Sequence, residues 1–598
     1  MIINALPSID VAFKGLPVLL DPHPEDFQFS LVFEDESEEQ CEAVRDVFNS
    51  LVASRVDKNG VARMSPFDLW MFRSKINDLG LLGLFRWHDA RSESIFTKFL
   101  ERSSLLQEVK KGSLNDTITD NFLKHAPYDD QKSVIAFSLL LDKSGDFSTM
   151  GLGKTFSGMY WFSVHKCAGK VNKCIVFCLN NNKSTWRRQL EEHTDLTYTI
   201  VRNGTHKVKK DIAKFFLAGT DVLIIHYDCL KSVVDDLAGV TGHAILIDEA
   251  HVLRHLNTHR SKAFFKFLNM THPNYVHALT GTAVNERPED AYAIIKAIAP
   301  YLVRTKEQFI DCFCVREWRY VTRRKRVKKV VGYKNLEWLR ALLSLVSVRK
   351  TVDEVQGMPK MVLQDVPVSP TTQQLKLYNQ IATETYREVA ALPQKALNLN
   401  MAMVKTLRLR QLLNHPSLLG EPGDSGKYLA LDALLEEVLS DSTAKAVVWS
   451  VFVPGVDLLA ERYRQYGALK MHGDVDNRDE VEEAFLTSPD TRVLVATPGT
   501  AGTGKDFTCS RYALYVDKSL CATEHFQSMR RTVRRGMTGT SVAISLRVPG
   551  SVDDWVENLL MRKKKLAMAL QDSTKTWEED PSVDKQELLD CLKGIVML

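Results

Sequence analysis

The sequence predicts an α/β fold with two tandem units, each built on a parallel sheet covered by helices, after a small accessory domain. Three observations support this prediction. Short, continuously apolar runs alternate with helix-compatible segments, which is typical of strands buried on both faces of a parallel sheet. A glycine-rich loop precedes the first series of such runs, and a second series begins near Lys427. Finally, a chain of 598 residues has room for several domains.

The composition is that of an ordinary globular protein. Apolar residues make up 44% and charged residues 25%, and the net charge is only +4, so any surface for nucleic acid must be local. The 10 cysteines show no paired C-x-x-C spacing, which argues against a structural zinc site and fits a reducing compartment. No apolar run approaches the ~18–20 residues of a membrane span, and the order of a signal peptide is missing. We therefore expect a cytoplasmic protein that is neither secreted nor bound to a membrane.

Residues 1–124 precede the glycine-rich loop and have the features of a small accessory domain. An alternating, strand-like pattern covers Phe27–Phe33, and large apolar side chains crowd Asp68–Phe72. Helix-compatible stretches lie between these two segments. We interpret the region as a small α/β domain with an ordinary hydrophobic core and leave its role open.

The segment Ser148–Thr155 has the form of the end of a phosphate-binding loop. Its glycines let backbone N–H groups turn towards a phosphate, Lys154 can reach the β- and γ-oxygens, and the Thr155 hydroxyl can ligate Mg²⁺. Upstream, the Gln131 amide has the donor and acceptor needed to pair with adenine. The pattern predicts a site for ATP and Mg²⁺, whereas the alternative is a glycine-rich turn before a helix. Its predicted contacts are Gln131, Met150, Gly151, Leu152, Gly153, Lys154 and Thr155.

An acidic pair follows the third apolar run after this loop. The runs, which predict parallel strands, are 174–179, 222–225 and 244–247. Ligand chemistry in parallel sheets lies at the carboxyl ends of strands. We therefore expect Asp248 to hold Mg²⁺ and Glu249 to orient an attacking water; two surface acids are the alternative. The next strand-like segment ends in residues placed to sense the γ-phosphate: Thr280, Gly281 and Thr282.

A basic segment follows the first unit. Between Arg316 and Lys334 there are nine basic residues and one acid, Glu317, and strand formers flank the centre of the cluster. We predict an exposed hairpin that contacts phosphate, rather than the merely solvated face that most charge runs form. The predicted contacts are Arg323, Arg324, Lys325, Arg326, Lys328 and Lys329.

The second unit lacks a lysine-bearing phosphate loop of its own. Its predicted strands are 446–449, 493–496 and 513–516. Downstream, Gln527, Arg531 and Arg534 have the spacing that places three side chains on one face of a helix. Such a guanidinium face suits an arginine finger that acts on a transferring phosphoryl group. The alternative is a basic surface helix.

In order and wording, these motifs resemble the superfamily-two helicase core in its Swi/Snf-type branch. Met150–Thr155 is similar to the family's nucleotide loop, Asp248–His251 to its acidic motif and Leu279–Thr282 to its third motif. Later similarities are Arg349-Lys350-Thr351, Gln411–Pro416, and the segments that begin at Gly502 and Gln527. The resemblance covers about Pro127 to Pro549. The compact spacing and Asn335-Leu336 look most like the HARP-type annealing-helicase branch and short phage-encoded relatives.

This resemblance implies two tandem RecA-like lobes that bind ATP and Mg²⁺ and hydrolyse ATP when DNA is bound. It divides the chain into an N-terminal accessory domain for DNA structure (1–124), an ATP-binding lobe (125–300), a connection with the basic hairpin (301–420), a second lobe (421–548) and a C-terminal helical extension (549–598). It implies catalysis by Lys154, Asp248, Glu249, Arg531 and Arg534. It also implies nucleotide contacts by Gly504 and Asp506, and coupling by His251, Thr280, Gly281, Thr282 and Gln527.

From the resemblance we expect a duplex DNA translocase that remodels branched DNA by fork regression, branch migration or strand annealing, in replication, recombination or repair. Contact would be with the backbone and independent of sequence. The alternatives are a strand-separating DNA or RNA helicase, a transcription-associated factor that binds RNA polymerase, and an inactive scaffold. We expect a monomer, in the cytosol of a bacterium or of a virus-infected host.

Overall fold

The computed structural model describes most of the chain, in two compact units. The first unit extends to Glu317 and includes Val330–Glu354, and the second includes Trp318–Lys329 and Val355–Met568. The described residues are 29–31, 38–52, 55–56, 62–63, 65–87, 90–119, 122–202, 204–217, 219–237, 242–281, 287–322, 325–355, 357–391, 399–502, 505, 507–533, 535, 537 and 539–569. Among them, no helix is long and apolar enough to cross a membrane.

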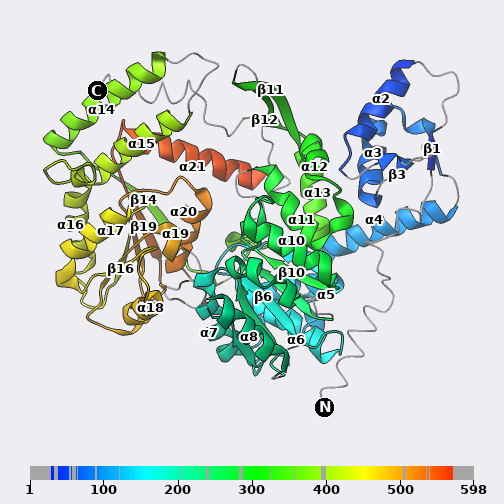
Figure 1. Cartoon of the computed structure of the whole chain (residues 1–598), viewed down its shortest axis with the longest axis horizontal. Helices are drawn as coiled ribbons and strands as arrows, with labels where there is room; N and C mark the ends of the chain where they lie inside the picture. The colour runs from blue at the N-terminus through cyan, green and yellow to red at the C-terminus, as the bar shows by residue number, and fades with distance from the viewer. Residues whose placement is uncertain are drawn as a thin grey trace. The chain divides into compact units, whose positions relative to one another are not determined.

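A parallel sheet forms the core of the first unit (Figure 1). Its strands are β5 (Lys143–Asp146), β6 (Cys174–Cys178), β7 (Tyr198–Ile200), β8 (Val222–His226), β9 (Ala244–Asp248), β10 (Tyr275–Leu279) and β13 (Ser347–Val348). Within the described residues the order is β13-β5-β10-β9-β6-β8-β7, and all neighbours are parallel. The parallel sheet predicted from the apolar runs is therefore confirmed. Because β13 lies beyond residue 300, the sheet also uses a strand from the predicted connection.

Helices connect the strands of the first unit. They are α5 (Asp129–Leu140), α6 (Lys154–Cys167), α7 (Lys183–His193), α8 (Thr205–Leu217), α9 (Val234–Leu237), α10 (His259–Thr271), α11 (Ala291–Ile298), α12 (Lys306–Phe313) and α13 (Leu336–Val346). Helix α6 begins at Lys154, within the last two residues of the predicted phosphate-loop segment. The loop is thus placed between the end of β5 and the first turn of a helix.

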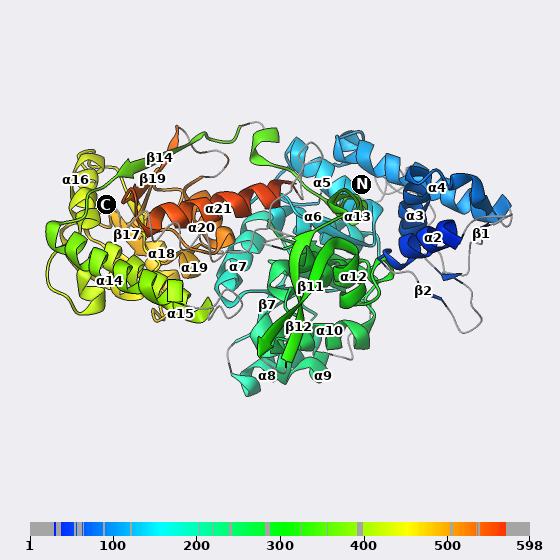
Figure 2. The same ribbon diagram turned by 90° about the horizontal axis from the view of Figure 1, so that it is seen from above.

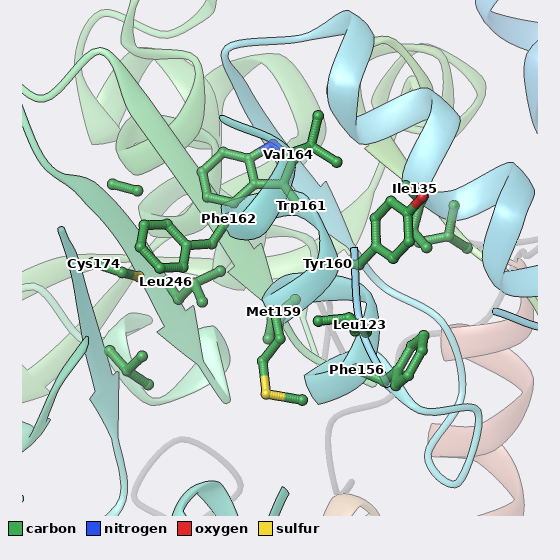
Figure 3. Close-up of a cluster of buried hydrophobic side chains, with 14 of the residues drawn as sticks. Leu123, Ile135, Phe156, Met159, Tyr160, Trp161, Phe162, Val164, Cys174 and Leu246 are labelled. Carbon is green, nitrogen blue, oxygen red and sulfur yellow. The ribbon is translucent and has the colours of Figure 1, made fainter. Parts of the chain in front are cut away.

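Helix α6 is buried over most of its length. Every side chain from Phe156 to Val164 is buried, and Figure 3 shows several of them packed between the sheet and α5. Gly158 lets the helix come close to the sheet, since a Cβ there would lie 3.3 Å from methyl groups of Leu246 and Leu279. A helix packed this tightly holds its N-terminus in a fixed position, because interiors are dense and resist displacement.

The N-terminal region is a small α/β structure in the residues described. Its elements are β1 (Phe29–Leu31), α2 (Glu38–Asn49), β2 (Arg55–Val56), β3 (Ala62–Arg63), α3 (Pro66–Asp78), β4 (Phe85–Trp87) and α4 (Ala90–Lys110). Helix α3 starts with a capping box between Ser65 and Asp68, which satisfies two orphan donors of the first turn. It packs on α13 through Trp70, whose ring centroid lies 5.3 Å from that of Trp338. The predicted strand at 27–33 is present as β1.

The second unit also contains a parallel sheet. Its strands are β14 (Met361–Pro367), β15 (Ala446–Trp449), β16 (Leu469–Met471), β17 (Val493–Ala496), β18 (Tyr512–Tyr515) and β19 (Ser541–Arg547). Among the described residues they are ordered β14-β19-β18-β15-β17-β16, all parallel. Both lobes of the predicted fold class are thus parallel α/β sheets. Strand β14 lies within 301–420, so this second sheet too draws on the predicted connection.

The helices of the second unit and a separate hairpin complete the fold. The helices are α14 (Thr372–Ala391), α15 (Leu399–Asn414), α16 (Gly426–Val438), α17 (Val453–Arg462), α18 (Arg478–Thr487), α19 (Pro498–Ala501), α20 (Ala522–Met529) and α21 (Val552–Ala569). Helix α15 ends at Asn414, two residues before Pro416, and proline cannot continue a helix. Strands β11 (Cys314–Thr322) and β12 (Lys325–Tyr333) pair with each other, as the basic segment predicts (Figure 2).

Candidate nucleotide site and basic hairpin

Two glycines give the predicted phosphate loop its shape. Gly151 and Gly153 have positive φ angles of 86° and 81°, a region that glycine enters without steric cost. A Cβ on Gly153 would lie 2.3 Å from Nε2 of Gln131, so the backbone passes where no side chain fits. The loop then opens into the 14-residue helix α6. Backbone N–H groups at a helix N-terminus form a natural site for a phosphate.

The Lys154 ammonium lies within the loop that precedes it. Its Nζ donates to the carbonyl oxygens of Ser148 at 2.8 Å and Thr149 at 3.4 Å. A Cβ on Gly281 would lie 3.6 Å from the same Nζ, so Lys154 is also next to the third motif. Neutral carbonyls are weaker partners for an ammonium than phosphate oxygens. This arrangement suits a lysine that exchanges backbone partners for nucleotide phosphates.

Residues that the sequence analysis did not select hold the start of the loop. The Ser148 N–H donates to Oδ1 of Asp146 at 2.9 Å. Lys350 brackets the loop from β13: its carbonyl accepts from the Thr149 N–H at 2.8 Å, and its own N–H donates to Oγ of Ser148 at 3.1 Å. Burial raises the pKa of Asp146, although the Lys154 charge and the Ser148 bonds act in the opposite direction. Two signals were available in the sequence, because Asp146 lies just before the loop and Lys350 lies within the segment Arg349-Lys350-Thr351 that resembles the family.

Gln131 lies beside the loop, as predicted, but its amide faces the protein. Its Nε2 donates to the Leu152 carbonyl at 3.2 Å, and its Oε1 accepts from the Tyr128 N–H at 3.0 Å. The side chain therefore caps the first turn of α5 and supports the loop. One amide hydrogen of Gln131 and its amide oxygen are thus already hydrogen-bonded within the chain. Recognition of adenine by Gln131 stays a prediction.

The carboxylate of Asp248 lies at the carboxyl end of β9 and is held by two side chains, while a third side chain holds the backbone of the same residue. Asn182 and Trp186 both donate to its Oδ2, at 2.9 Å and 3.1 Å, and the Tyr227 hydroxyl donates to its backbone carbonyl at 2.6 Å. Burial and the neighbouring Glu249 raise the pKa of Asp248, while these donors and the Lys154 charge lower it. Both donors approach one oxygen, so the other suits a cation.

Glu249, the second acid, has an unusual backbone conformation. Its φ and ψ are both 49°, a left-handed conformation that costs a non-glycine residue on the order of 1–3 kcal/mol and is concentrated at functional sites. His251 links it to the third motif, because its Nδ1 lies 3.1 Å from Oε2 of Glu249 and 3.1 Å from Oγ1 of Thr280. The Thr280 N–H in turn donates to the Asp146 carbonyl at 3.0 Å. The acidic motif, the third motif and the strand before the loop thus form one hydrogen-bonded network.

The site fits Mg²⁺ held together with a nucleotide. Thr155 is the second residue of α6 and Asp248 ends β9. The described residues contain no group of three or more His, Cys, Asp or Glu side chains able to hold a metal on their own. Mg²⁺ in nucleotide sites typically takes one or two protein ligands and completes its shell with phosphates and water. A hydroxyl and one carboxylate oxygen are therefore a sufficient donor set.

Comparison with known proteins identifies the region that carries this network. The profile of the SNF2-related domain matches residues 147–418. This part of the chain is therefore similar to the SNF2-related domain, as the motifs predict. Relatives include an uncharacterized ATP-dependent helicase of Mycoplasma genitalium, 21% identical over 74% of this chain and 41% of the relative. The human DNA annealing helicase and endonuclease ZRANB3 is 21% identical, over 73% of this chain and 40% of its own length.

Other matches extend over a larger share of the matched protein's own length. A DNA repair and recombination protein RAD54-like of Drosophila persimilis is 21% identical over 83% of this chain and 72% of its own length. Among solved structures, the Sulfolobus solfataricus SWI2/SNF2 ATPase core in complex with dsDNA covers 76% of this chain and 97% of its own, at 20% identity and a TM-score of 0.36. The chain spans less than half the length of the curated relatives that match it first.

The second unit differs from the prediction at Arg531. The prediction that Gln527 and Arg531 share one helix is wrong, because α20 ends at Met529 and Arg531 lies in a 3₁₀ turn. Its Nε donates to the Gly502 carbonyl at 2.9 Å and its Nη1 to the Lys505 carbonyl at 3.0 Å. Arg531 therefore fastens the loop after β17, and its role as a finger stays a prediction. Gln527 is buried. The predicted residues Thr282, Gly504, Asp506 and Arg534 lie outside the described residues.

The basic hairpin exposes cations, as predicted. Arg326, Lys328 and Lys329 are exposed on β12. Arg323 and Arg324 lie outside the described residues, and of Lys325 only the backbone is described. The sequence analysis did not single out Trp318 on β11, which is 56% exposed. Its signal was present in the sequence, because a tryptophan within a strongly charged segment has little core to join.

Proposed function

We propose that this chain is a DNA-dependent ATPase that moves along duplex DNA and remodels branched DNA. The observation that carries the proposal is that the charges of Lys154 and Glu249 both act on Asp248, inside the region that matches the SNF2-related domain. These three residues supply the parts that ATP hydrolysis requires: a charge for the phosphates, a metal ligand and a carboxylate for water.

Each part has a separate task in hydrolysis. Lys154 would offset charge on the β- and γ-phosphates, and Thr155 and Asp248 would hold Mg²⁺, which neutralises charge on the phosphate oxygens when bound. Glu249 would orient the attacking water. His251 and Thr280 would then pass the state of the γ-phosphate to the rest of the lobe, because they join the acidic motif to the third motif. We assign Arg534, with Arg531, to stabilisation of transition-state charge.

The preference for branched DNA rests on the relatives and on the basic hairpin. Proteins that match the chain are named as a DNA annealing helicase and as a DNA repair and recombination protein, and the motif wording resembles the annealing branch. Exposed cations on the hairpin suit contact with backbone phosphates. A strand-separating helicase and a polymerase-binding factor remain the alternative proposals, and the intact Lys154 and Glu249 argue against an inactive scaffold.

The proposal is tested with purified full-length chain in two assays. First, ATP turnover is measured with single-stranded, duplex, forked and four-way DNA, and we expect stimulation by duplex and branched forms. Second, a four-way junction with homologous arms is compared with a tailed duplex, and we expect junction migration with little unwinding of the tail. Efficient unwinding with the junction untouched would support the helicase alternative. No stimulation by any DNA would refute the proposal.

A further inference from the structure

A tryptophan on the basic hairpin has no core to join. Among the tryptophans that the structure describes, Trp318 alone is exposed. Two strands, β11 and β12, form the whole of its sheet in the described part of the chain. Removing a large apolar side chain from water stabilises a protein. Trp318 leaves most of this gain unused within the chain.

Two cations lie against the same ring. The guanidinium carbon of Arg326 is 4.8 Å from the ring centroid of Trp318, and Nζ of Lys328 is 5.7 Å from it. These distances are within the range of cation–π attraction, and the attraction limits the positions of the ring. Lys329 adds a further exposed cation on β12. An aromatic face and three cations are therefore brought together on one short hairpin.

The base of the hairpin is firmly attached to the first unit. Arg316 of β11 donates to Asp311 at 2.9 Å and to Glu307 at 2.5 Å, both on α12. After β12, Asn335 donates from Nδ2 to the Cys312 carbonyl at 2.7 Å and accepts from Nζ of Lys75 at 3.0 Å. Strand β11 is thus anchored near its first residue, and β12 just after its last. A hairpin anchored at both strands loses less conformational freedom on binding than a loose loop would.

We propose that Trp318 stacks on an unpaired base at a junction of single- and double-stranded DNA, while Arg326, Lys328 and Lys329 bind the neighbouring phosphates. This inference rests on the proposed function, since it names the part of the DNA that the hairpin contacts. Every base offers a π-face, so stacking on an aromatic side chain is tolerant of sequence. Paired bases inside a duplex present no free face to Trp318. The ring therefore selects for a place where the duplex ends or opens.

The charge pattern favours nucleic acid over other occupants. An apolar protein partner would need to bury the cations beside Trp318, and burying charges without partners is costly. A DNA end supplies an aromatic surface and anionic oxygens a few ångströms apart, which satisfies both kinds of group at once. Single exposed hydrophobic residues are common on protein surfaces. It is the combination with Arg326 and Lys328 at the ring that indicates a ligand.

The test uses 2-aminopurine placed at the first unpaired base of a DNA fork, with full-length protein and no nucleotide. We expect the wild type to quench its fluorescence, and Trp318→Ala to lose the quenching and weaken fork binding by about 5- to 150-fold, because stacking is worth about 1–3 kcal/mol per base. Affinity for relaxed closed-circular duplex, which has no strand end, should change less than twofold. Trp318→Phe should restore most of both signals.

Two further variants separate charge from stacking. Lys329→Ala should weaken fork and circle alike and reduce the salt slope by about 0.9, whereas Trp318→Ala should leave that slope unchanged. Leu429→Ala removes another exposed hydrophobic side chain, on α16, and should behave as the wild type.

The outcomes distinguish this inference from the proposed function. Unchanged fork binding in Trp318→Ala, or an equal loss on fork and circle, would overturn the inference. A wild type that binds neither DNA would instead refute the proposed function.

Discussion

Lys110 should make the stability of the first unit rise with pH. It is the last residue of α4, its Nζ donates to the Ser344 carbonyl and lies 4.8 Å from the ring centroid of Phe137, and burial lowers its pKa to about 7. The unfolded chain keeps the ordinary lysine pKa of about 10.4. Between these values the unfolded chain binds more protons than the folded chain, so the free energy of unfolding increases with pH.

The size of the effect follows from the difference between the two pKa values. Each pH unit above the folded pKa adds about 1.4 kcal/mol. The Phe137 ring and the Ser344 carbonyl both stabilise the charged form of Lys110 in the folded chain. The free energy of unfolding therefore rises by only about 1.5 kcal/mol between pH 7 and pH 9. For a unit of this size, such a gain raises the melting temperature by about 2 °C.

The variant Lys110→Met isolates this contribution, because methionine retains much of the side-chain volume and does not titrate. Thermal unfolding of wild type and variant is compared at each pH, and hydrogen exchange of α4 and α13 identifies the transition of the first unit. The melting temperature of the wild type should rise relative to that of the variant between pH 7 and pH 9. Lys111→Met is the matched control, since the Lys111 side chain is 71% exposed. A difference that stays constant with pH, or that changes equally in the control, would refute the reasoning.

Three shorter predictions concern the proposed activity. Lys154→Ala should lose nearly all ATP hydrolysis, and Glu249→Gln should bind ATP but hydrolyse it slowly; near-normal turnover in both would contradict the site. Arg534→Ala should reduce turnover by about 10³-fold or more while nucleotide binding is retained, and equal losses in both assays would exclude a finger. Changing the cluster Arg323–Arg326 to alanine should lower the slope of log affinity against log salt by about 0.9 for each lost phosphate contact. An unchanged slope would indicate that the cluster is only a solvated surface.

The fold was predictable because its signals are local. The run 446–449 has the bounds of β15, and 493–496 those of β17, since a strand buried on both faces is uniformly apolar and its ends are marked by polar residues. Strand β14 was missed because it lacks this signal. Most of its residues are exposed, so no apolar run marks it, and its parallel pairing with β19 is a contact between distant segments.

The candidate site was predictable only where chemistry and sequence neighbourhood coincide. Lys154 and Asp248 follow a glycine-rich loop and a buried strand, which are patterns with a physical cause. Asn182 and Trp186 carry no such pattern, because they meet Asp248 only after β6 and β9 have paired. Arg531 was misassigned because side-chain spacing on a helix has meaning only while the helix continues, and α20 ends two residues earlier.

The structure links the N-terminal region to the phosphate loop by a short path. Nζ of Lys350 donates at 2.6 Å to the carbonyl of Lys110, at the end of α4. The backbone of the same Lys350 binds Ser148 and Thr149 at the start of the loop. One residue therefore contacts both the last turn of an N-terminal helix and the segment that would hold ATP. Because packed contacts transmit small displacements rather than absorb them, a change at α4 has a direct route to the nucleotide site. This gives the N-terminal region a physical connection to ATP binding that its composition alone did not indicate.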